Sequence, residues 1–309
     1  MAKGRRGRNY DGWVAPPLTI AALTWQILLG MAATFLFFLI ITITLLRVSP
    51  WSARGPYLLL AFVTLALIAS CVLSAVSMRS LVIDNITKLR LSSASSFLGA
   101  VQDAFLPAVI LYLLHLRGNV LRGVKGNTVT PIASQLWKRI LDWSWVTLTF
   151  IFYLVLLGYR ANWYNNLLSS MLTEDLFRQY VNISRGLAYT IDALRFLLFL
   201  NVIVSMIVHF VQSKNAQARD PVTTRLLIMA APSFMIYAIL SVAVDIILNV
   251  AATTATFNIE AFILAATIIM GICGIMILVA LVNTMLLPNV QWTPQKAVTP
   301  MEHRGALVQ

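Results

Sequence analysis

The chain has 309 residues, of which 59% are hydrophobic and only 11% are charged. Soluble globular domains carry about 25% charged residues, so this composition excludes a soluble protein and predicts a polytopic membrane protein. The 23 Lys and Arg residues outnumber the 11 Asp and Glu residues, for a formal net charge of +12. Nearly all of the basic residues lie in connectors and tails, so they indicate membrane topology and not a nucleic-acid partner.

Seven apolar segments are long enough to cross about 30 Å of hydrocarbon as helices. In chain order they cover residues 18–46, 57–78, 97–116, 140–159, 187–211, 225–250 and 261–287. The first is too long for the apolar core of a signal peptide, so we count it as a span. A basic tail of residues 1–17 precedes the spans, and a short tail of residues 288–309 follows them. The sequence therefore predicts an all-α fold, a seven-transmembrane-helix bundle with short connectors that forms a single domain over residues 1–309.

Seven spans place the two tails on opposite sides of the membrane. The carboxy-terminal side carries 12 Lys and Arg residues and the amino-terminal side carries 10, so the positive-inside rule is nearly balanced. Both glycosylation sequons, at Asn85 and Asn182, fall in connectors on the amino-terminal side and are glycosylation candidates. We therefore expect a multi-pass protein of the plasma membrane or an endomembrane, with its amino terminus outside or lumenal.

Several chemistries known in membrane proteins do not fit this sequence. No lysine lies in a span, which excludes a covalently linked retinal. Cys71 and Cys273 lie in spans, so they predict neither a disulfide framework nor a metal site. His115 and His209 lie near span ends, and we expect them to be interfacial residues with hydrated tips and not zinc ligands. We expect no cofactor, no metal and no enzymatic activity.

The layout resembles that of seven-helix receptors in topology alone. The third span ends in LHLRGN, without the acidic residue that precedes the arginine in the largest receptor class. The seventh span ends in LVNTMLLP and lacks an Asn-Pro-x-x-Tyr motif. The resemblance therefore covers the chain without identifying a family.

Ionisable residues within spans are candidates for function, because each costs about 2.5–3.5 kcal/mol to insert into a membrane. Three acids and one arginine lie at similar depths below the outer ends of spans three, five and six, on the amino-terminal side of the membrane, and two glutamines lie at comparable depths. We predict a polar cavity in the outer, amino-terminal third of the bundle, over a sealed and apolar inner half. Its predicted ligand-binding residues are Gln26, Gln102, Asp103, Asp192, Arg195 and Asp245.

Two prolines lie within spans and are predicted conformational hinges. Pro107 cannot bond the carbonyl of Asp103, and Pro232 cannot bond that of Ile228, because proline has no N–H. Each position therefore predicts a bend in its helix, beside the acid in span three and toward the inner end of span six.

The cluster of acids is compatible with three roles. Its members can staple helices together, form a ligand pocket, or line an ion or proton path. Our leading hypothesis is a membrane protein of receptor-like organisation that binds a small cationic ligand. The alternatives are a transporter or proton-coupled carrier, against which the apolar inner half argues, and a structural membrane protein. The predicted partners are the lipid bilayer and a small-molecule ligand, and the sequence identifies no cytoplasmic coupling partner.

Overall fold

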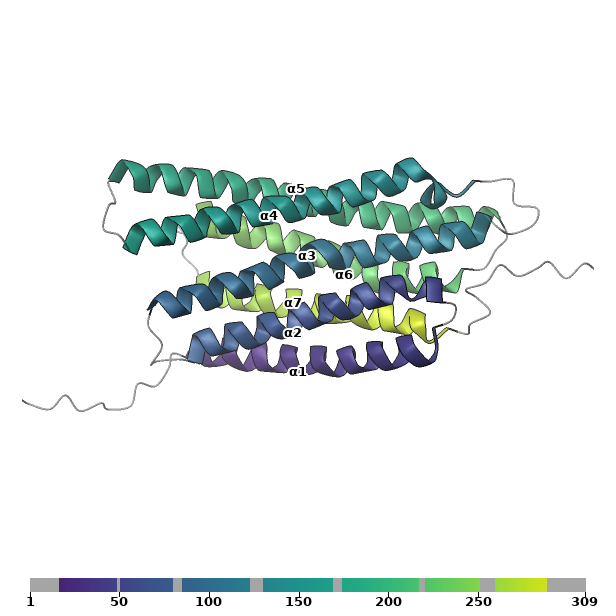
Figure 1. Ribbon diagram of the computed structural model, residues 1–309, viewed down its shortest axis with the longest axis horizontal. Coiled ribbons are helices and arrows are strands. Elements are labelled where there is room, and N and C mark those ends of the chain that lie inside the picture. The colour runs from purple at the N-terminus through teal and green to yellow at the C-terminus, as the bar shows by residue number, and fades with distance from the viewer. Residues whose placement is uncertain are drawn as a thin grey trace, which may run out of the picture.

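The computed structural model describes residues 17–48, 51–79, 85–122, 130–168, 174–216, 220–250 and 259–287. Within these ranges, seven long helices run antiparallel along one axis (Figure 1). Two single-turn 3-10 helices, η1 and η2, precede α2 and α4. The elements are α1 (Pro17–Leu46), η1 (Trp51–Ala53), α2 (Gly55–Arg79), α3 (Asn85–Arg122), η2 (Ile132–Ser134), α4 (Leu136–Leu168), α5 (Glu174–Asn215), α6 (Pro221–Val250) and α7 (Ile259–Met285).

All seven helices are long and apolar enough to span a membrane, which confirms the predicted all-α, seven-span fold. Large apolar side chains cover the outside of the bundle. Phe35 and Phe38, for example, are 70% and 65% exposed. Such side chains are stable outside the protein core only where lipid surrounds them, so the chain is an integral, multi-pass membrane protein.

We define the amino-terminal end of the bundle as the end where α1, α3, α5 and α7 begin, and the carboxy-terminal end as the opposite one. Consecutive helices pack against each other, α1 also packs against α7, and α3 also packs against α5 (Figure 1). Helix α3 is the innermost helix. In its most apolar 18-residue stretch 61% of the residues are buried, against 22–39% in the other helices. A polar residue on α3 can therefore contact residues of several other helices.

Helices α3, α4 and α5 are longer than their predicted spans, at 38, 33 and 42 residues. Aromatic stacking joins the end of α4 to the start of α5: the ring centroids of Trp163 and Tyr180 are 4.1 Å apart, and those of Tyr159 and Tyr180 are 5.3 Å apart. The predicted placement of Asn182 in a connector is wrong. Helix α5 begins at Glu174, and Asn182 is an exposed residue of this helix. Asn85 is the first residue of α3, and its side chain lies outside the described residues.

Small residues allow α1 to approach its neighbours closely. A Cβ atom at Gly271 of α7 would lie 2.7 Å from the ring of Trp25, and one at Gly30 would lie 3.3 Å from Cβ of Cys71. Close approach of helix backbones at glycine is a common source of packing energy in membranes. These two glycines are packing positions.

Helices α3 and α6 remain helical across Pro107 and Pro232. Beside the second proline, the Ser233 hydroxyl donates to the Met229 carbonyl at 3.0 Å, a contact that often accompanies bending of a helix. The hinge role of both prolines stays a prediction.

Candidate functional site

Arg195 of α5 lies at the centre of a polar cluster midway along the bundle. Its Nη1 lies 3.2 Å from Oδ2 of Asp103 on α3, and its Nη2 lies 2.5 Å from Oδ1 of Asp192, one turn earlier on α5. Nη2 also donates to the hydroxyl of Ser241 on α6. The spacing of three residues between Asp192 and Arg195 places both on one helix face. One guanidinium thus joins three helices.

Two tyrosines complete the shell around Asp103. Tyr153 of α4 donates to Oδ2 at 2.8 Å, and Tyr237 of α6 donates to Oδ1 at 2.7 Å. Phenolic donors stabilise a carboxylate without neutralising it, so two formal negative charges face one positive charge. The side chains of Asp103, Asp192 and Arg195 are only 16%, 11% and 12% exposed. We call Asp103, Tyr153, Asp192, Arg195, Tyr237 and Ser241 the Arg195 cluster.

The remaining predicted cavity residues differ in their placement. Gln102 lines a small cavity beside Asp103 and Tyr237, of about 10 Å³, enough for about one water molecule. Gln26 lies apart from the cluster, in a groove of about 530 Å³ between α1 and α2. Asp245 belongs to α6, but its side chain lies outside the described residues. The structure therefore brings together Asp103, Asp192, Arg195 and Gln102, and separates Gln26 from them.

The position of the cluster along its helices also differs from the prediction. Asp103 and Asp192 each lie 18 residues after the first residue of their helices, or about 27 Å along the axis. They lie near the middle of α3 and α5, because these helices begin 12 and 13 residues, or about three and a half turns, before the predicted spans. The carboxylates of the cluster are bonded by donors of the cluster itself, and the cavity beside them has a volume of about 10 Å³.

A second polar cluster lies between the Arg195 cluster and the carboxy-terminal end. Nε2 of His115 on α3 is 2.9 Å from Oδ2 of Asp142 on α4. Lys138, one turn earlier on α4, bonds Oδ1 of Asp142 and also donates to Oδ1 of Asn201 on α5 at 2.8 Å. The Asn201 amide in turn donates to Asp142 at 2.8 Å. We call these four residues the Asp142 cluster; it joins α3, α4 and α5.

A third cluster lies at the carboxy-terminal end, where Asp220 directly precedes α6. Its Oδ1 accepts the Val222 N–H at 3.2 Å, the geometry of a helix N-cap. The same oxygen lies 2.9 Å from Nη2 of Arg117 on α3, while Oδ2 lies 3.2 Å from Nε2 of His209 on α5. Burial opposes ionisation of Asp220, but the hydrogen bond from His209 and the charge of Arg117 hold its pKa below the usual range. We call Arg117, His209, Asp220 and Thr223 the Asp220 cluster.

These two clusters overturn two predictions. The inner half of the bundle is not sealed and apolar, because it holds two buried carboxylates paired with cations. His115 and His209 are not hydrated interfacial residues, since they are 4% and 1% exposed. The signals were present in the sequence: Asp142 lies within the predicted fourth span, and an Asp before Pro is typical of a helix start. They were missed because residues near span ends were assumed to reach water, whereas the long helices bury them.

Among the described residues, no group of three or more His, Cys, Asp or Glu side chains is arranged to hold a metal ion. Each cluster instead pairs carboxylates with cationic or hydrogen-bond donors from neighbouring helices. Such an arrangement can bind helices together, and it can store two conformations if one pair can break.

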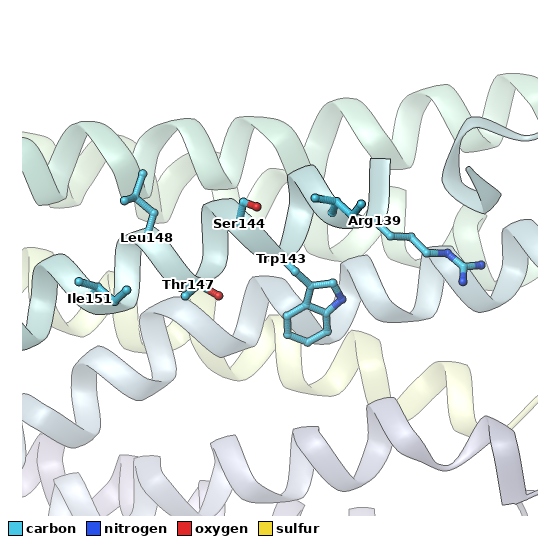
Figure 2. Close-up of a pocket in the computed structure, with 7 residues that line it drawn as sticks. Arg139, Trp143, Ser144, Thr147, Leu148 and Ile151 are labelled. Carbon is cyan, nitrogen blue, oxygen red and sulfur yellow. The ribbon is translucent and has the colours of Figure 1, made fainter. Parts of the chain in front are cut away.

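A further concave surface lies on the outside of α4, near the same end of the bundle (Figure 2). It has a volume of about 570 Å³ and follows α4 from Arg139 to Ile151. We call it the α4 groove. Its walls are mainly apolar, but Arg139, Ser144 and Thr147 add polar groups.

Comparisons of the chain with protein families, with curated proteins and with solved structures found no match. The three clusters and the grooves are therefore interpreted from their own geometry.

Proposed function

We propose that this membrane protein is a receptor-like conformational switch, without catalytic activity, in which α6 is the moving helix. One observation carries the proposal: α6 is held to α3 and α5 at two separate points, with Pro232 between them. Toward one end, Tyr237 and Ser241 belong to the Arg195 cluster; at the other, Asp220 is paired with Arg117. A helix with two polar anchors and a proline between them can release one anchor while keeping the other.

The Arg195 cluster is the proposed site of the stimulus. Asp103 and Asp192 share one guanidinium, so a cationic ligand competes with Arg195 for a carboxylate. The adjacent cavity of about 10 Å³ is too small for such a ligand. Binding therefore requires displacement of Arg195 or Tyr237, and displacement alters the contact that this cluster makes with α6. Gln102 and Asp245 remain proposed ligand contacts, and Pro107 and Pro232 remain proposed hinges.

The Asp220 cluster is the proposed output. Loss of the Arg117–Asp220 pair frees the start of α6, at the carboxy-terminal end of the bundle, from α3 and exposes buried residues of its first turns. Leu226 is one of these residues, at 0% exposure. Movement of this end would open a surface for a cytoplasmic coupling partner, whose identity the chain does not specify.

Cysteine labelling tests the switch. Both native cysteines, Cys71 and Cys273, are buried, so a maleimide that labels Leu226→Cys in lipid nanodiscs reports on that position. We expect slow labelling in the parent and faster labelling after Asp220→Asn, by about tenfold for each 1.4 kcal/mol of lost anchoring. Asparagine remains a good N-cap, so this substitution removes the charge and keeps the helix start.

Met285→Cys is the matched control, because Met285 is 1% exposed at the same end of the bundle, but on α7. Its labelling should not change with Asp220→Asn. Equal acceleration at both positions would indicate general loosening of the bundle and would contradict the switch.

A proton-coupled carrier is the second candidate, and one observation favours it. The three clusters follow each other along α3 from Asp103 through His115 to Arg117. However, about 18 Å of α3 separates Asp103 from His115, and the intervening Val109, Ile110 and Leu113 are completely buried. Proton flux in liposomes that is abolished by Asp142→Asn would favour the carrier over the receptor. A purely structural role predicts neither flux nor selective labelling of α6.

We further propose that the amino-terminal end faces the outside or the lumen, in the plasma membrane or an endomembrane. This orientation makes the exposed Asn182 available for glycosylation and leaves Gln309 on the cytoplasmic side. An endoglycosidase-sensitive band shift that is lost in Asn182→Gln supports it. If antibodies bind a tag at Gln309 on intact, unpermeabilised cells, the orientation is the opposite one.

A further inference from the structure

The α4 groove begins at the carboxy-terminal end of the bundle with Arg139, a cation that forms no ion pair with the described residues. Nη2 of Arg139 donates to Oδ1 of Asn119 on α3 at 2.6 Å. Its Nε is buried and has no hydrogen-bond partner among the described residues. The carboxylate nearest in sequence, Asp142, is occupied by Lys138 and His115. Arg139 is therefore held in place by an amide and not by a carboxylate, so the exposed outer part of its guanidinium can donate to an external anion.

The rest of the α4 groove is shaped for a hydrocarbon chain. Trp143, Leu148 and Ile151 supply apolar surface along α4, away from Arg139 (Figure 2). The Trp143 ring is fixed edge to face against Tyr112 of α3, with centroids 6.4 Å apart. From Arg139 to Ile151 the axial rise is about 18 Å, similar to one leaflet of a hydrocarbon core that is about 30 Å thick.

We infer that the α4 groove is a binding site for one anionic phospholipid. The phosphate-bearing headgroup accepts hydrogen bonds from Arg139, and one acyl chain lies against Trp143, Leu148 and Ile151. Arginine at the headgroup level is suited to a phosphate, because its planar donors match two phosphate oxygens. The position of Arg139 in the first turn of α4 adds the favourable field of a helix N-terminus.

The groove between α1 and α2 provides an internal comparison. It has a similar volume of about 530 Å³ and is also open to the surroundings of the bundle, but no Lys or Arg lines it. A lipid there has no reason to be selected by headgroup charge. The inference therefore concerns selectivity at Arg139, beyond the general contact of a membrane protein with the bilayer.

Native mass spectrometry can test this selectivity. The full chain is ejected from nanodiscs that contain equal amounts of phosphatidylglycerol and phosphatidylcholine, and the retained lipids are counted. We expect the parent to retain phosphatidylglycerol preferentially. Arg139→Gln should lower that preference about fivefold, which corresponds to the loss of one interfacial cation.

Two variants separate the site from general surface charge. Arg122→Gln removes an exposed arginine at the same end of the bundle, on α3, and should change the preference by less than about twofold. Thr147→Trp fills the groove at an exposed position and keeps Arg139; it should reduce retention of the anionic lipid while the thermal stability in detergent is preserved. Equal retention of both lipids by the parent, or equal effects of Arg122→Gln and Arg139→Gln, would overturn the inference.

Discussion

Two parts of the bundle are held together by different interactions. Helices α3, α4, α5 and α6 are joined by three buried clusters of carboxylates, cations, histidines and hydroxyl groups. Contacts of α1, α2 and α7 within the described residues are mainly apolar, with neutral hydroxyl pairs such as Tyr57–Thr284, at 3.3 Å, and Ser74–Ser95, at 2.9 Å. One cation also contacts this part, since Arg225 of α6 donates to the carbonyl and to the side-chain oxygen of Asn283 on α7 at 2.8 and 2.9 Å. The first part is therefore sensitive to charge, and the second part is held mainly by uncharged contacts.

The difference has an energetic consequence. Removing one member of a buried ion pair leaves an uncompensated charge and costs several kcal/mol, whereas a hydroxyl contact between membrane helices contributes about 0.6 kcal/mol on average. In the proposed switch, we therefore expect a stimulus that acts on charge to release α6 and to leave α1, α2 and α7 in place. The following predictions test this contrast.

The largest effect is expected from Arg195→Ala, because it leaves Asp103 and Asp192 buried without a cation. Thermal unfolding in detergent should show a loss of about 3–5 kcal/mol and low expression. Asp103→Asn should cost only about 1 kcal/mol, because the amide still accepts a tyrosine hydrogen bond and Arg195 keeps Asp192.

A neutral triple variant, Arg195→Met with Asp103→Asn and Asp192→Asn, is the control for charge. It should recover most of the stability lost in Arg195→Ala. If each single Asp→Asn change were as damaging as Arg195→Ala, the cluster would act only as a structural staple.

Asp142→Asn should have an intermediate effect of about 1.5–3 kcal/mol, since the amide keeps one oxygen acceptor but leaves Lys138 buried without a counter-charge. The thermal unfolding midpoint would measure it. Adding Lys138→Met should restore part of the loss. A double variant that is less stable than Asp142→Asn would show that charge pairing is not what stabilises this cluster.

Acidification should weaken the Asp220 cluster. The pKa of Asp220 lies below its ordinary value of 3.8, so its contribution to stability is complete above that value and is lost as the pH falls toward the lowered pKa. We expect the parent to lose this stability between about pH 5 and about pH 2. Asp220→Asn lacks the carboxylate and has already lost it at neutral pH, so the variant should show a smaller loss over the same pH range. Identical acid profiles for the two proteins would contradict this assignment.

The smallest effect is expected from Ser95→Ala at the α2–α3 contact. Ser95 bonds the hydroxyl groups of Ser70 and Ser74 at 3.0 and 2.9 Å. Its removal should lower the free energy of unfolding by about 0.6 kcal/mol. The labelling rate of Leu226→Cys should not respond to Ser95→Ala, and a large increase would show that α1, α2 and α7 are not a passive scaffold.

The number of spans, their order and the all-α class follow from the distribution of apolar residues along the chain. A membrane core offers no hydrogen-bond partner to the backbone, so every long apolar stretch has to form a helix. The pairing of Asp192 with Arg195 was also predictable, because residues three apart share a helix face. Asp103 could be identified as a candidate from its intramembrane position alone.

In contrast, the contacts between polar residues could not be predicted without the packing of the helices. Gln26 and Asp103 occupy similar predicted depths, yet rotation of α1 places Gln26 in a separate groove. Asp220 and Arg117 are 103 residues apart, and their contact depends on how α3 lies beside α6. Depth along a helix follows from residue number, but the direction in which a side chain points depends on the packing of all seven helices. The Asp142 and Asp220 clusters are buried for this reason, although their residues lie near span ends where water was expected.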